Sequence, residues 1–389
     1  RLSQSLQRIL EIEEPLRRFF YESHYANRDP ADPANCDFVA GNPQEMVLPE
    51  YVESLQRWTV PQDKDWYAYK FNEPYAQEAA AAGLGERRGV PYEADVILVT
   101  DGAFAGLNLC IRTVTDPGDE VIFLTPPWFF YEAIILGGQA DPVRVAVNYE
   151  TWDLDLDAIE AAITERTTAI IVNSPNNPSG VIYPASVFVE IEAMLARASH
   201  PIVLVSDEPY RALVFDDVAV PEVPPLVTRS IVATSWSKSL AIPGERIGYL
   251  AFSPRMPEAA ELFEACTFTS RVLGFVNAPA LWQWVVAEVG DQVIDVSPYR
   301  EKRDLMYEGL TRIGYQCVKP QGAFYVFPRT PIDDEVGFVR LLAEEGVLTV
   351  PGSGFGMPGH MRISLTVERE TVVRALPGFE RTFRKARGG

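Results

Sequence analysis

The feature that most constrains the fold of this chain is a repeated alternation, from about residue 95, of short apolar runs with helical stretches. Each run is apolar throughout, not only at every second position, which is typical of strands buried on both faces of a parallel sheet. The runs lie at residues 96–99, 121–124, 169–172, 202–205, 231–233 and 247–250. Because strands that alternate with helices build doubly wound folds, we predict an α/β protein in three layers, with helices on both faces of a mostly parallel sheet.

The pattern changes after about residue 290, where a long charged helix is expected over residues 299–313 and shorter strands follow. A chain of 389 residues is long enough for two domains. We therefore predict a large domain at 41–290 and a smaller α+β domain, formed by residues 1–40 together with 291–389.

Acidic residues dominate the charge, since 34 Lys and Arg residues against 54 Asp and Glu residues give a net charge of −20. This argues against a nucleic-acid partner, which requires a basic surface, and against docking on an anionic membrane. No apolar stretch approaches the length of a membrane-spanning helix, and the first residues lack the apolar core of a signal peptide. The four cysteines are far apart and fit free thiols, so we expect a cytoplasmic protein.

Histidine is scarce, because only His24, His200 and His360 occur and none lies near another at a metal-ligand spacing. We therefore expect neither a zinc enzyme nor a histidine-based hydrolase, and we predict no metal site. Difficult chemistry in this chain would need Lys, Tyr, Asp, Arg or a cofactor.

One lysine occupies an unusual position. Lys238 follows the apolar run at 231–233, and Arg246 comes eight residues after it. A buried ammonium group is unfavourable, so a lysine here suits a Schiff base with an aldehyde cofactor, and the arginine suits the phosphate of that cofactor. A solvated loop lysine is the alternative for this residue taken alone.

Small residues follow the run at 96–99. Gly102, Ala103 and Phe104 open a predicted helix, where backbone N–H groups can approach a phosphate. A glycine between a strand and a helix also fits an ordinary turn. The position matters because ligands of open α/β sheets bind beyond the carboxyl ends of the strands.

Polar residues follow two further runs. Asp207 comes after the run at 202–205 and would suit a protonated pyridine nitrogen, since this ion pair keeps the ring an electron sink. Tyr210, three residues on, and Asn177, in the turn after 169–172, can hydrogen-bond a phenolic oxygen of the same ring. The segment around Asn177 also fits a simple turn cluster.

In this order along the chain, these motifs resemble those of the class I and II aminotransferases, the fold-type-I pyridoxal phosphate enzymes. The resemblance extends from about Gly41 to Arg362, most of the chain. It includes the motif that ends at Tyr325 (Pro-x-Gly-Ala-Phe-Tyr) and the one that ends at Gly356 (Val-Pro-Gly-x-Gly-Phe-Gly).

The resemblance implies a role for each matching residue around pyridoxal phosphate. Lys238 would form the Schiff base, Asp207 would pair with the ring nitrogen, and Trp128 would stack on the ring. Asn177 and Tyr210 would hydrogen-bond the ring oxygen. The phosphate would be held by Ser235, Arg246 and the amides of Gly102, Ala103 and Phe104, with Ser237 a weaker candidate.

The resemblance also implies where the substrate binds. Arg362 matches the arginine that holds the substrate α-carboxylate, and the backbone at Gly41 would approach the same group. Trp128 and Asn177 would border the substrate as well. Tyr69 resembles a tyrosine that reaches the neighbouring phosphate across a homodimer interface, although the family often has a glycine where this chain has Pro74.

The expected reaction is transfer of an amino group from an L-amino acid to a 2-oxo acid by a ping-pong mechanism in a homodimer. Arg271 lies near the place of a distal arginine in dicarboxylate-specific relatives, and it also fits a surface arginine. The stretch at 239–246 resembles bacterial aspartate aminotransferases, so aspartate and 2-oxoglutarate are the expected pair. The scaffold alternatively supports β-elimination, cyclopropane formation or amino-acid oxidation.

A second alternative belongs to another class, a regulator whose aminotransferase-like domain senses a ligand. Such proteins carry a DNA-binding domain ahead of this core. Only about 40 residues precede Gly41, and the net charge is −20, so this reading is disfavoured.

Overall fold

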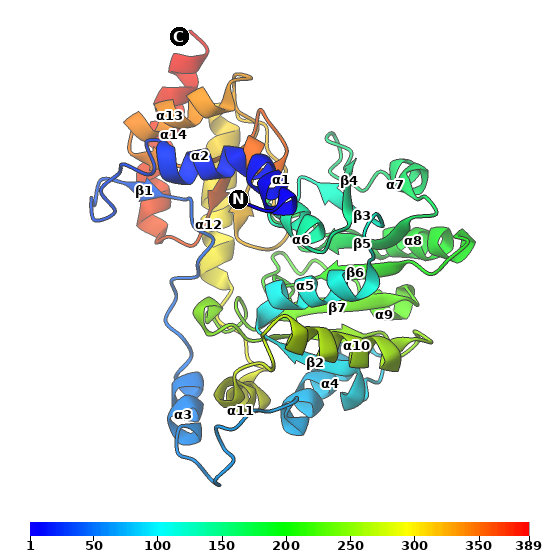
Figure 1. Cartoon of the computed structure of the whole chain (residues 1–389). Coiled ribbons are helices and arrows are strands. Elements are labelled where there is room, and N and C mark those ends of the chain that lie inside the picture. The colour runs from blue at the N-terminus through cyan, green and yellow to red at the C-terminus, as the bar shows by residue number, and fades with distance from the viewer. Residues whose placement is uncertain (389) are drawn as a thin grey trace.

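The computed structural model describes residues 1–388, the side chains of residues 87 and 88 excepted. Its central feature is a seven-stranded sheet with the strand order β2-β8-β7-β6-β5-β3-β4 (Figure 1). The strands are β2 (Ile97–Thr100), β3 (Glu120–Thr125), β4 (Asp141–Ala146), β5 (Thr167–Asn173), β6 (Val203–Asp207), β7 (Ser230–Ser235) and β8 (Gly248–Phe252). The predicted α/β fold with a mostly parallel sheet is confirmed.

Two details of the sheet were not predicted from the sequence. β8 runs antiparallel to both of its neighbours, β2 and β7. Because β8 is buried along its whole length, its composition gives no sign of its direction. β4 was not predicted, since this edge strand is only partly buried and contains Pro142, which is unusual inside a sheet.

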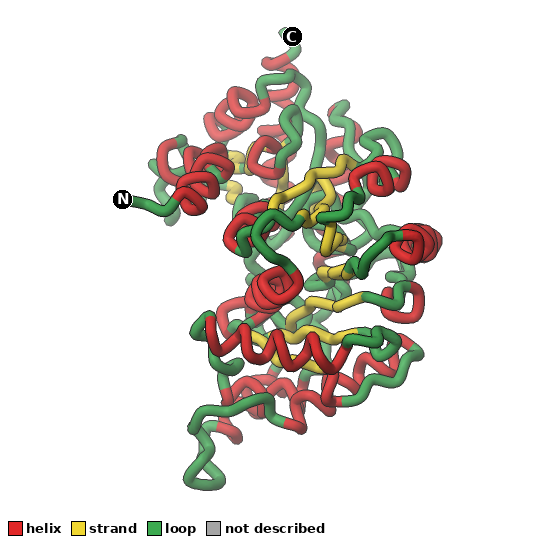
Figure 2. The backbone as a smooth tube through the Cα atoms, turned by 45° about the vertical axis from the view of Figure 1, so that its right-hand side comes forward, coloured by secondary structure: helices red, strands yellow, loops and turns green. Residues whose placement is uncertain are grey.

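Helices cover both faces of the sheet, and Figure 2 shows the strands lying between them. Adjacent residues of β7 point to opposite faces, because Ile231 and Ala233 belong to one hydrophobic cluster and Val232 to another. The cluster of Ile231 contains α5 (Gly102–Val114), α6 (Tyr131–Gly137) and α10 (Ala259–Val272). The opposite face is covered by α4 (Pro74–Arg88), α7 (Leu156–Ala162), α8 (Ala185–Arg197), α9 (Val223–Leu226) and α11 (Ala280–Val289).

A second body combines the two ends of the chain (Figure 1). The N-terminal β1 (Cys36–Asp37) pairs in parallel with β10 (Val347–Leu348), and β11-β12-β9 form a small antiparallel sheet. The other elements are α1 (Gln4–Ile12), α2 (Glu14–Glu22), α12 (Ser297–Ile313), β9 (Tyr325–Val326), α13 (Glu335–Glu344), β11 (Val350–Pro351), η3 (Gly352–Phe355), β12 (Met361–Ser364) and α14 (Arg369–Ala386). The helix expected at 299–313 is confirmed as α12.

The hydrophobic core of this second body continues into the larger one, since Phe38 and Phe324 share a cluster with Phe215 and Ala241. The proposed domain boundaries at residues 41 and 290 therefore stay a prediction. Among the residues described, no helix combines the length and apolar character needed to cross a membrane. Within the same part of the chain, no three His, Cys, Asp or Glu side chains gather as metal ligands.

Candidate active site

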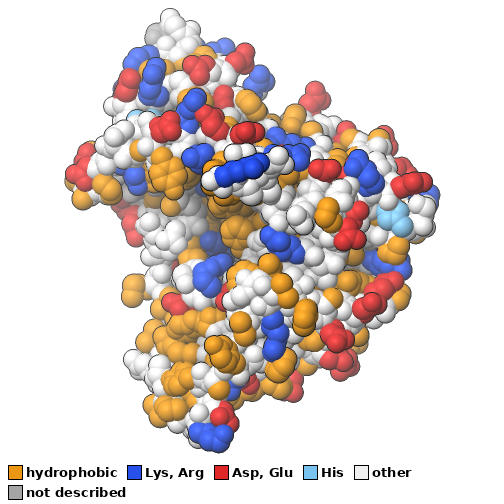
Figure 3. All heavy atoms as spheres, viewed as in Figure 1, with side chains coloured by type: hydrophobic (Ala, Val, Ile, Leu, Met, Phe, Trp, Pro, Cys, Tyr) orange, Lys and Arg blue, Asp and Glu red, His pale blue; other side chains and the backbone are white. Residues whose placement is uncertain are grey.

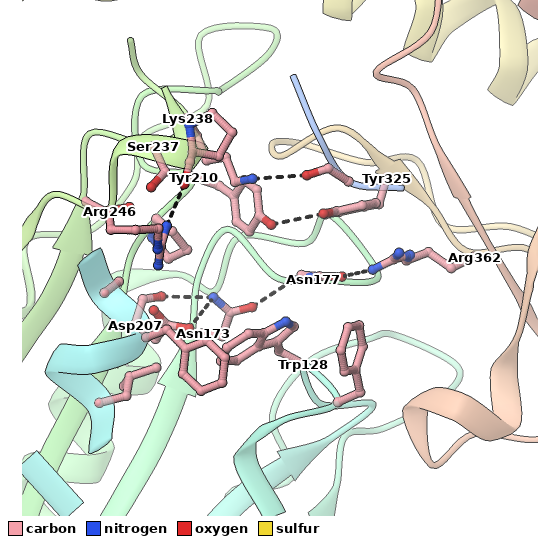
Figure 4. Close-up of a pocket in the computed structure, with 18 residues that line it drawn as sticks. Trp128, Asn173, Asn177, Asp207, Tyr210, Ser237, Lys238, Arg246, Tyr325 and Arg362 are labelled. Carbon is pink, nitrogen blue, oxygen red and sulfur yellow. Dashed lines mark hydrogen bonds between the residues drawn. The ribbon is translucent and has the colours of Figure 1, made fainter. Parts of the chain in front are cut away.

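A cavity of about 250 Å³ opens at the carboxyl ends of β5, β6 and β7 (Figure 4). The sheet register brings these ends together, since Asn173 is paired with Asp207 and Asp207 with Ala233. Most residues proposed from the sequence line this cavity: Gly41, Ala103, Phe104, Trp128, Asn177, Asp207, Tyr210, Ser235, Ser237, Lys238, Arg246 and Arg362. Residues from several strand and helix ends and from both bodies thus meet in one place.

Lys238 lies just beyond β7, and its Nζ donates a hydrogen bond to the backbone oxygen of Gly41 at 3.0 Å. Burial lowers the pKa of Lys238 to about 8, and the charges of Arg246 and Arg362 act in the same direction. About a tenth of this amine is therefore neutral, and so nucleophilic, at pH 7, far more than for an ordinary lysine.

Asp207 ends β6 and is buried, with 3% of its surface exposed. Its Oδ2 accepts hydrogen bonds from the Tyr131 hydroxyl and, at 3.4 Å, from Asn173 Nδ2. Its Oδ1 has no partner among the described residues. Burial raises the pKa of Asp207 to about 7, the Tyr131 hydrogen bond lowers it, and nearby Glu208 raises it. A buried carboxyl with a free oxygen suits a cationic or protonated ligand atom.

The turn after β5 is connected to the same carboxyl group. Asn173 donates to the backbone oxygen of Asp207 at 2.9 Å, and its Oδ1 accepts from the backbone N–H of Asn177 at 2.7 Å. Asn177 Oδ1 in turn accepts from Arg362 Nη1 at 3.3 Å (Figure 4). The hydroxyls of Tyr210 and Tyr325 are hydrogen-bonded to each other at 3.0 Å. Burial holds the pKa of Tyr210 well above its usual value, so this hydroxyl stays neutral.

The start of α5 forms a close-fitting cradle with Arg246. Gly102 has a φ of +84°, and a Cβ atom there would approach Arg246 Nη2 to 2.7 Å. Ala103 and Phe104 line the cavity in the first turn of α5, where backbone N–H groups are free of helical partners. Together with Ser235 and Ser237, this arrangement suits a phosphate group.

Arg362 comes from β12 of the second body and is 4% exposed. Its Nη2 donates to the backbone oxygen of Val39 at 2.8 Å, and its Nε has no partner among the described residues. The rings of Tyr325 and Phe355 lie 4.6 and 4.7 Å from the guanidinium carbon. This fixed, buried guanidinium suits a carboxylate. Space next to it is tight, since a Cβ at Gly41 would come within 2.0 Å of the Tyr325 hydroxyl.

Three proposed residues are not part of the cavity wall: Gly102, which lies behind Arg246, and the more distant Tyr69 and Arg271. Tyr69 is 90% exposed and does not line the cavity. Arg271 lies in the last turn of α10, and its guanidinium carbon is 3.9 Å from the centre of the Phe71 ring. The cations that line the cavity are therefore Lys238, Arg246 and Arg362.

Sequence reasoning gave no role to several residues at this site. Leu107, Phe129, Asn173, Pro209, Pro243 and Tyr325 also line the cavity, and Tyr131 contacts Asp207 from outside it. Asn173 could have been found from its position, because it is the first residue of the polar turn after a buried run. Tyr325 belongs to one of the motifs that resemble the family. Nothing in the sequence around Tyr131 indicated its role, because its partner is 76 residues away.

Comparison with known proteins agrees with this geometry. The family of aminotransferases class I and II matches residues 36–378, so the chain belongs to this family of pyridoxal phosphate-dependent enzymes. The aspartate/prephenate aminotransferase of Thermus thermophilus is 34% identical over 358 residues, which cover 90% of this chain and 91% of that protein. The aspartate aminotransferase of Thermotoga maritima is 31% identical over 356 residues, 88% of this chain and 90% of that one.

Solved structures give the same result. An aminotransferase from Eubacterium rectale has a TM-score of 0.88 and 34% identity, covering 99% of this chain and 96% of that chain. An aspartate aminotransferase of Thermus thermophilus with maleate has a TM-score of 0.83 and 28% identity, and the match covers 98% of this chain and 99% of that chain.

The residues described here fit pyridoxal phosphate. The unpartnered Asp207 Oδ1 is a buried acceptor of the kind that a protonated ring nitrogen needs. The Gly102 backbone and Arg246 form a cradle that a larger side chain would fill. A lysine amine of lowered pKa lies in the same cavity.

Proposed function

We propose that this enzyme transfers the amino group of an L-amino acid to a 2-oxo acid in two half-reactions of a ping-pong mechanism, with aspartate and 2-oxoglutarate as the pair. The observation that carries the proposal is the convergence of three groups on one cavity: the amine of Lys238, the free oxygen of Asp207 and the guanidinium of Arg362.

Each group has a role toward the cofactor. The phosphate would be held by Arg246, Ser235, Ser237 and the amides of Gly102, Ala103 and Phe104. Asp207 would pair with the ring nitrogen, Asn177 and Tyr210 would hydrogen-bond the ring oxygen, and Trp128 would stack on the ring. Lys238 would supply the amine for the aldehyde. When bound, pyridoxal phosphate withdraws electrons from the substrate Cα, so that a proton leaves it more easily.

The chain's own residues position the substrate and move that proton. Arg362 binds the α-carboxylate, and the backbone at Gly41 limits the space beside it. The neutral Nζ of Lys238 would take the proton from Cα and return it to the carbon that was the cofactor's aldehyde, which leaves the amine free again. Its lowered pKa supports this role, because a fully protonated ammonium group could not accept a proton.

The choice of aspartate rests on the named relatives and not on a distal cation of this chain. A second carboxylate needs a donor beyond Lys238, Arg246 and Arg362, which have other roles. We propose that a partner chain in a homodimer completes the site, with Tyr69 reaching the phosphate of the neighbouring site. Exposed apolar side chains on the segment that carries Tyr69 support this: Val60, Tyr67 and Phe71 are 59, 58 and 68% exposed. Figure 3 shows hydrophobic side chains gathered where α3 (Pro49–Trp58) and α11 lie.

An absorbance titration tests the proposal. The purified enzyme loaded with pyridoxal phosphate should show a visible band that L-aspartate bleaches and 2-oxoglutarate restores. A band that aspartate leaves unchanged would contradict the substrate pair. Release of ammonia without an oxo acid would contradict transamination and favour elimination or oxidation. Lys238→Ala serves as the matched control and should lack the band.

A further inference from the structure

Asp207 accepts a hydrogen bond from a tyrosine that does not line the cavity. Tyr131 is the first residue of α6, its side chain is 2% exposed, and its hydroxyl donates to Asp207 Oδ2. Because Tyr131 is outside the cavity wall, its hydroxyl reaches bound molecules only through Asp207, whereas its ring also packs against Trp128, which lines the cavity.

The hydrogen bonds to this carboxyl group are unevenly shared between its two oxygens. Tyr131 and Asn173 both donate to Oδ2, whereas Oδ1 has no partner in the described part of the chain. A carboxyl group fixed through one oxygen cannot rotate freely without losing those bonds. The free oxygen is thereby kept available on a group that lines the cavity.

Tyr131 also opposes the electrostatic effect of burial. Burial favours the neutral form of Asp207, and so does the nearby charge of Glu208, while the hydroxyl of Tyr131 favours the charged form. A carboxylate that accepts a hydrogen bond is a weaker base than one that does not. Without the hydroxyl, a shared proton would therefore move toward Asp207 and away from a ligand nitrogen.

We propose that Tyr131 is a positioning residue that keeps the Asp207 carboxyl ionised and oriented, with Oδ1 directed to the ring nitrogen of the cofactor. The inference rests on the proposed role of Asp207. Removal of the Tyr131 hydroxyl then weakens the electron sink without removing any group that touches cofactor or substrate.

The surroundings of Tyr131 allow the hydroxyl to be tested separately from the ring. The Tyr131 N–H donates to the Trp128 backbone oxygen at 3.1 Å, and the two rings meet edge to face with centroids 5.6 Å apart. Tyr131→Phe keeps the ring and both contacts and removes only the donor to Asp207. Tyr315→Phe is a matched control, because that buried hydroxyl donates to the Phe379 backbone oxygen in the other body.

The experiment uses the full-length holoenzyme loaded with pyridoxal phosphate that carries ¹⁵N in its ring. The ¹⁵N chemical shift is followed against pH, and kcat and KM are measured for each variant. In Tyr131→Phe the ring nitrogen should lose its proton about one pH unit or more lower than in the wild type. The kcat should fall by roughly 10- to 100-fold, with a much smaller change in KM. Tyr315→Phe should match the wild type in both measurements.

Asp207→Asn separates failure of this inference from failure of the proposed function. If Asp207→Asn deprotonates the ring nitrogen and Tyr131→Phe leaves it unchanged, the role of Tyr131 is wrong and that of Asp207 stands. If Asp207→Asn also leaves the nitrogen signal unchanged, the proposed role of Asp207 is itself wrong.

A second variant covers the case in which Tyr131→Phe does not fold. Incorporation of 3-fluorotyrosine at position 131 keeps the shape of the side chain and makes the hydroxyl a stronger donor. The pH at which the ring nitrogen loses its proton should then rise. An unchanged midpoint in this variant overturns the inference.

Discussion

The Nζ of Lys238 and the backbone oxygen of Gly41 are hydrogen-bonded at 3.0 Å across 197 residues of sequence. The partner of the lysine is thus a neutral carbonyl and not a carboxylate. Burial lowers the pKa of this amine most, and the positive charges of Arg246 and Arg362 lower it further. This environment stabilises the neutral amine and explains why the pKa is lowered.

The first prediction concerns the pH dependence of cofactor uptake. Because only a neutral amine attacks an aldehyde, the rate at which cofactor-free enzyme takes up pyridoxal phosphate should rise with pH, with a midpoint near the Lys238 pKa of about 8. Stopped-flow absorbance between pH 6.5 and 9.5 measures this rate. A rate that still rises tenfold per pH unit at pH 9.5, as expected for the ordinary lysine value of 10.5, would show that the amine is not in this environment.

The second prediction compares two glycines of left-handed conformation. Gly102 (φ +84°) faces Arg246, whereas Gly118 (φ +95°) has open space around the position of a Cβ. Substitution by Ala strains the backbone at both sites and should lower stability by about 1 kcal/mol in each case. Only Gly102→Ala should also weaken cofactor binding, by tenfold or more, in a fluorescence titration. Equal cofactor affinity of the two variants would exclude a cradle at Gly102.

The third prediction concerns the substrate carboxylate. Arg362→Lys keeps the charge but loses the planar fork of donors, so kcat/KM for amino acids should fall by roughly 10- to 100-fold. Cofactor affinity should remain that of the wild type, because Arg362 has no proposed contact with the phosphate. Arg329→Lys is the control, since Arg329 is exposed, and its backbone forms an isolated bridge with His360, two residues before Arg362. A similar loss in both variants would point to a general defect.

The fourth prediction is a conflict between stability and function at Asp207. Its folded pKa of about 7 lies above the ordinary 3.8, so the folded state binds more protons between these values. In the cofactor-free wild type, the contribution of Asp207 to the free energy of unfolding therefore falls as pH rises from about 4 to 7. Asp207→Asn removes this effect and should unfold at a higher temperature than wild type at pH 8, by a margin that vanishes near pH 4. Differential scanning calorimetry measures the margin, while the loaded variant should lose activity.

The fifth prediction tests the proposed dimer. Light scattering should give twice the mass of one chain. Lys238→Ala and Tyr69→Ala should each be poorly active alone, and mixing them should restore activity, because one site of a hybrid dimer then has both intact residues. Since Tyr69 is 90% exposed, its replacement should not affect folding of the chain. Hybrid dimers that form without regaining activity would exclude a role for Tyr69 across the interface.

The sequence allowed the α/β fold and most residues of the cavity wall to be predicted, because both follow from local rules. Buried runs mark strands, and the residues at their carboxyl ends, such as Asp207 and Asn177, meet at one edge of the sheet. The direction of β8 could not be predicted, since a fully buried strand has the same composition in either direction.

Contacts between distant segments also lay beyond sequence reasoning. The hydrogen bond from Tyr131 to Asp207 depends on how α6 packs against the sheet. The position of Arg271 over Phe71, outside the cavity of its own chain, depends on the path of the segment before α4. Periodicity and spacing contain neither kind of information.

Asn173 uses its amide nitrogen for Asp207 and its carbonyl oxygen for Asn177. Aspartate at this position would lack the donor, leucine would lack both groups, and glutamine would be one methylene too long. A replacement at residue 173 would therefore disturb the carboxyl group of Asp207 and the turn at Asn177 together, although Asn173 has no proposed contact with the cofactor.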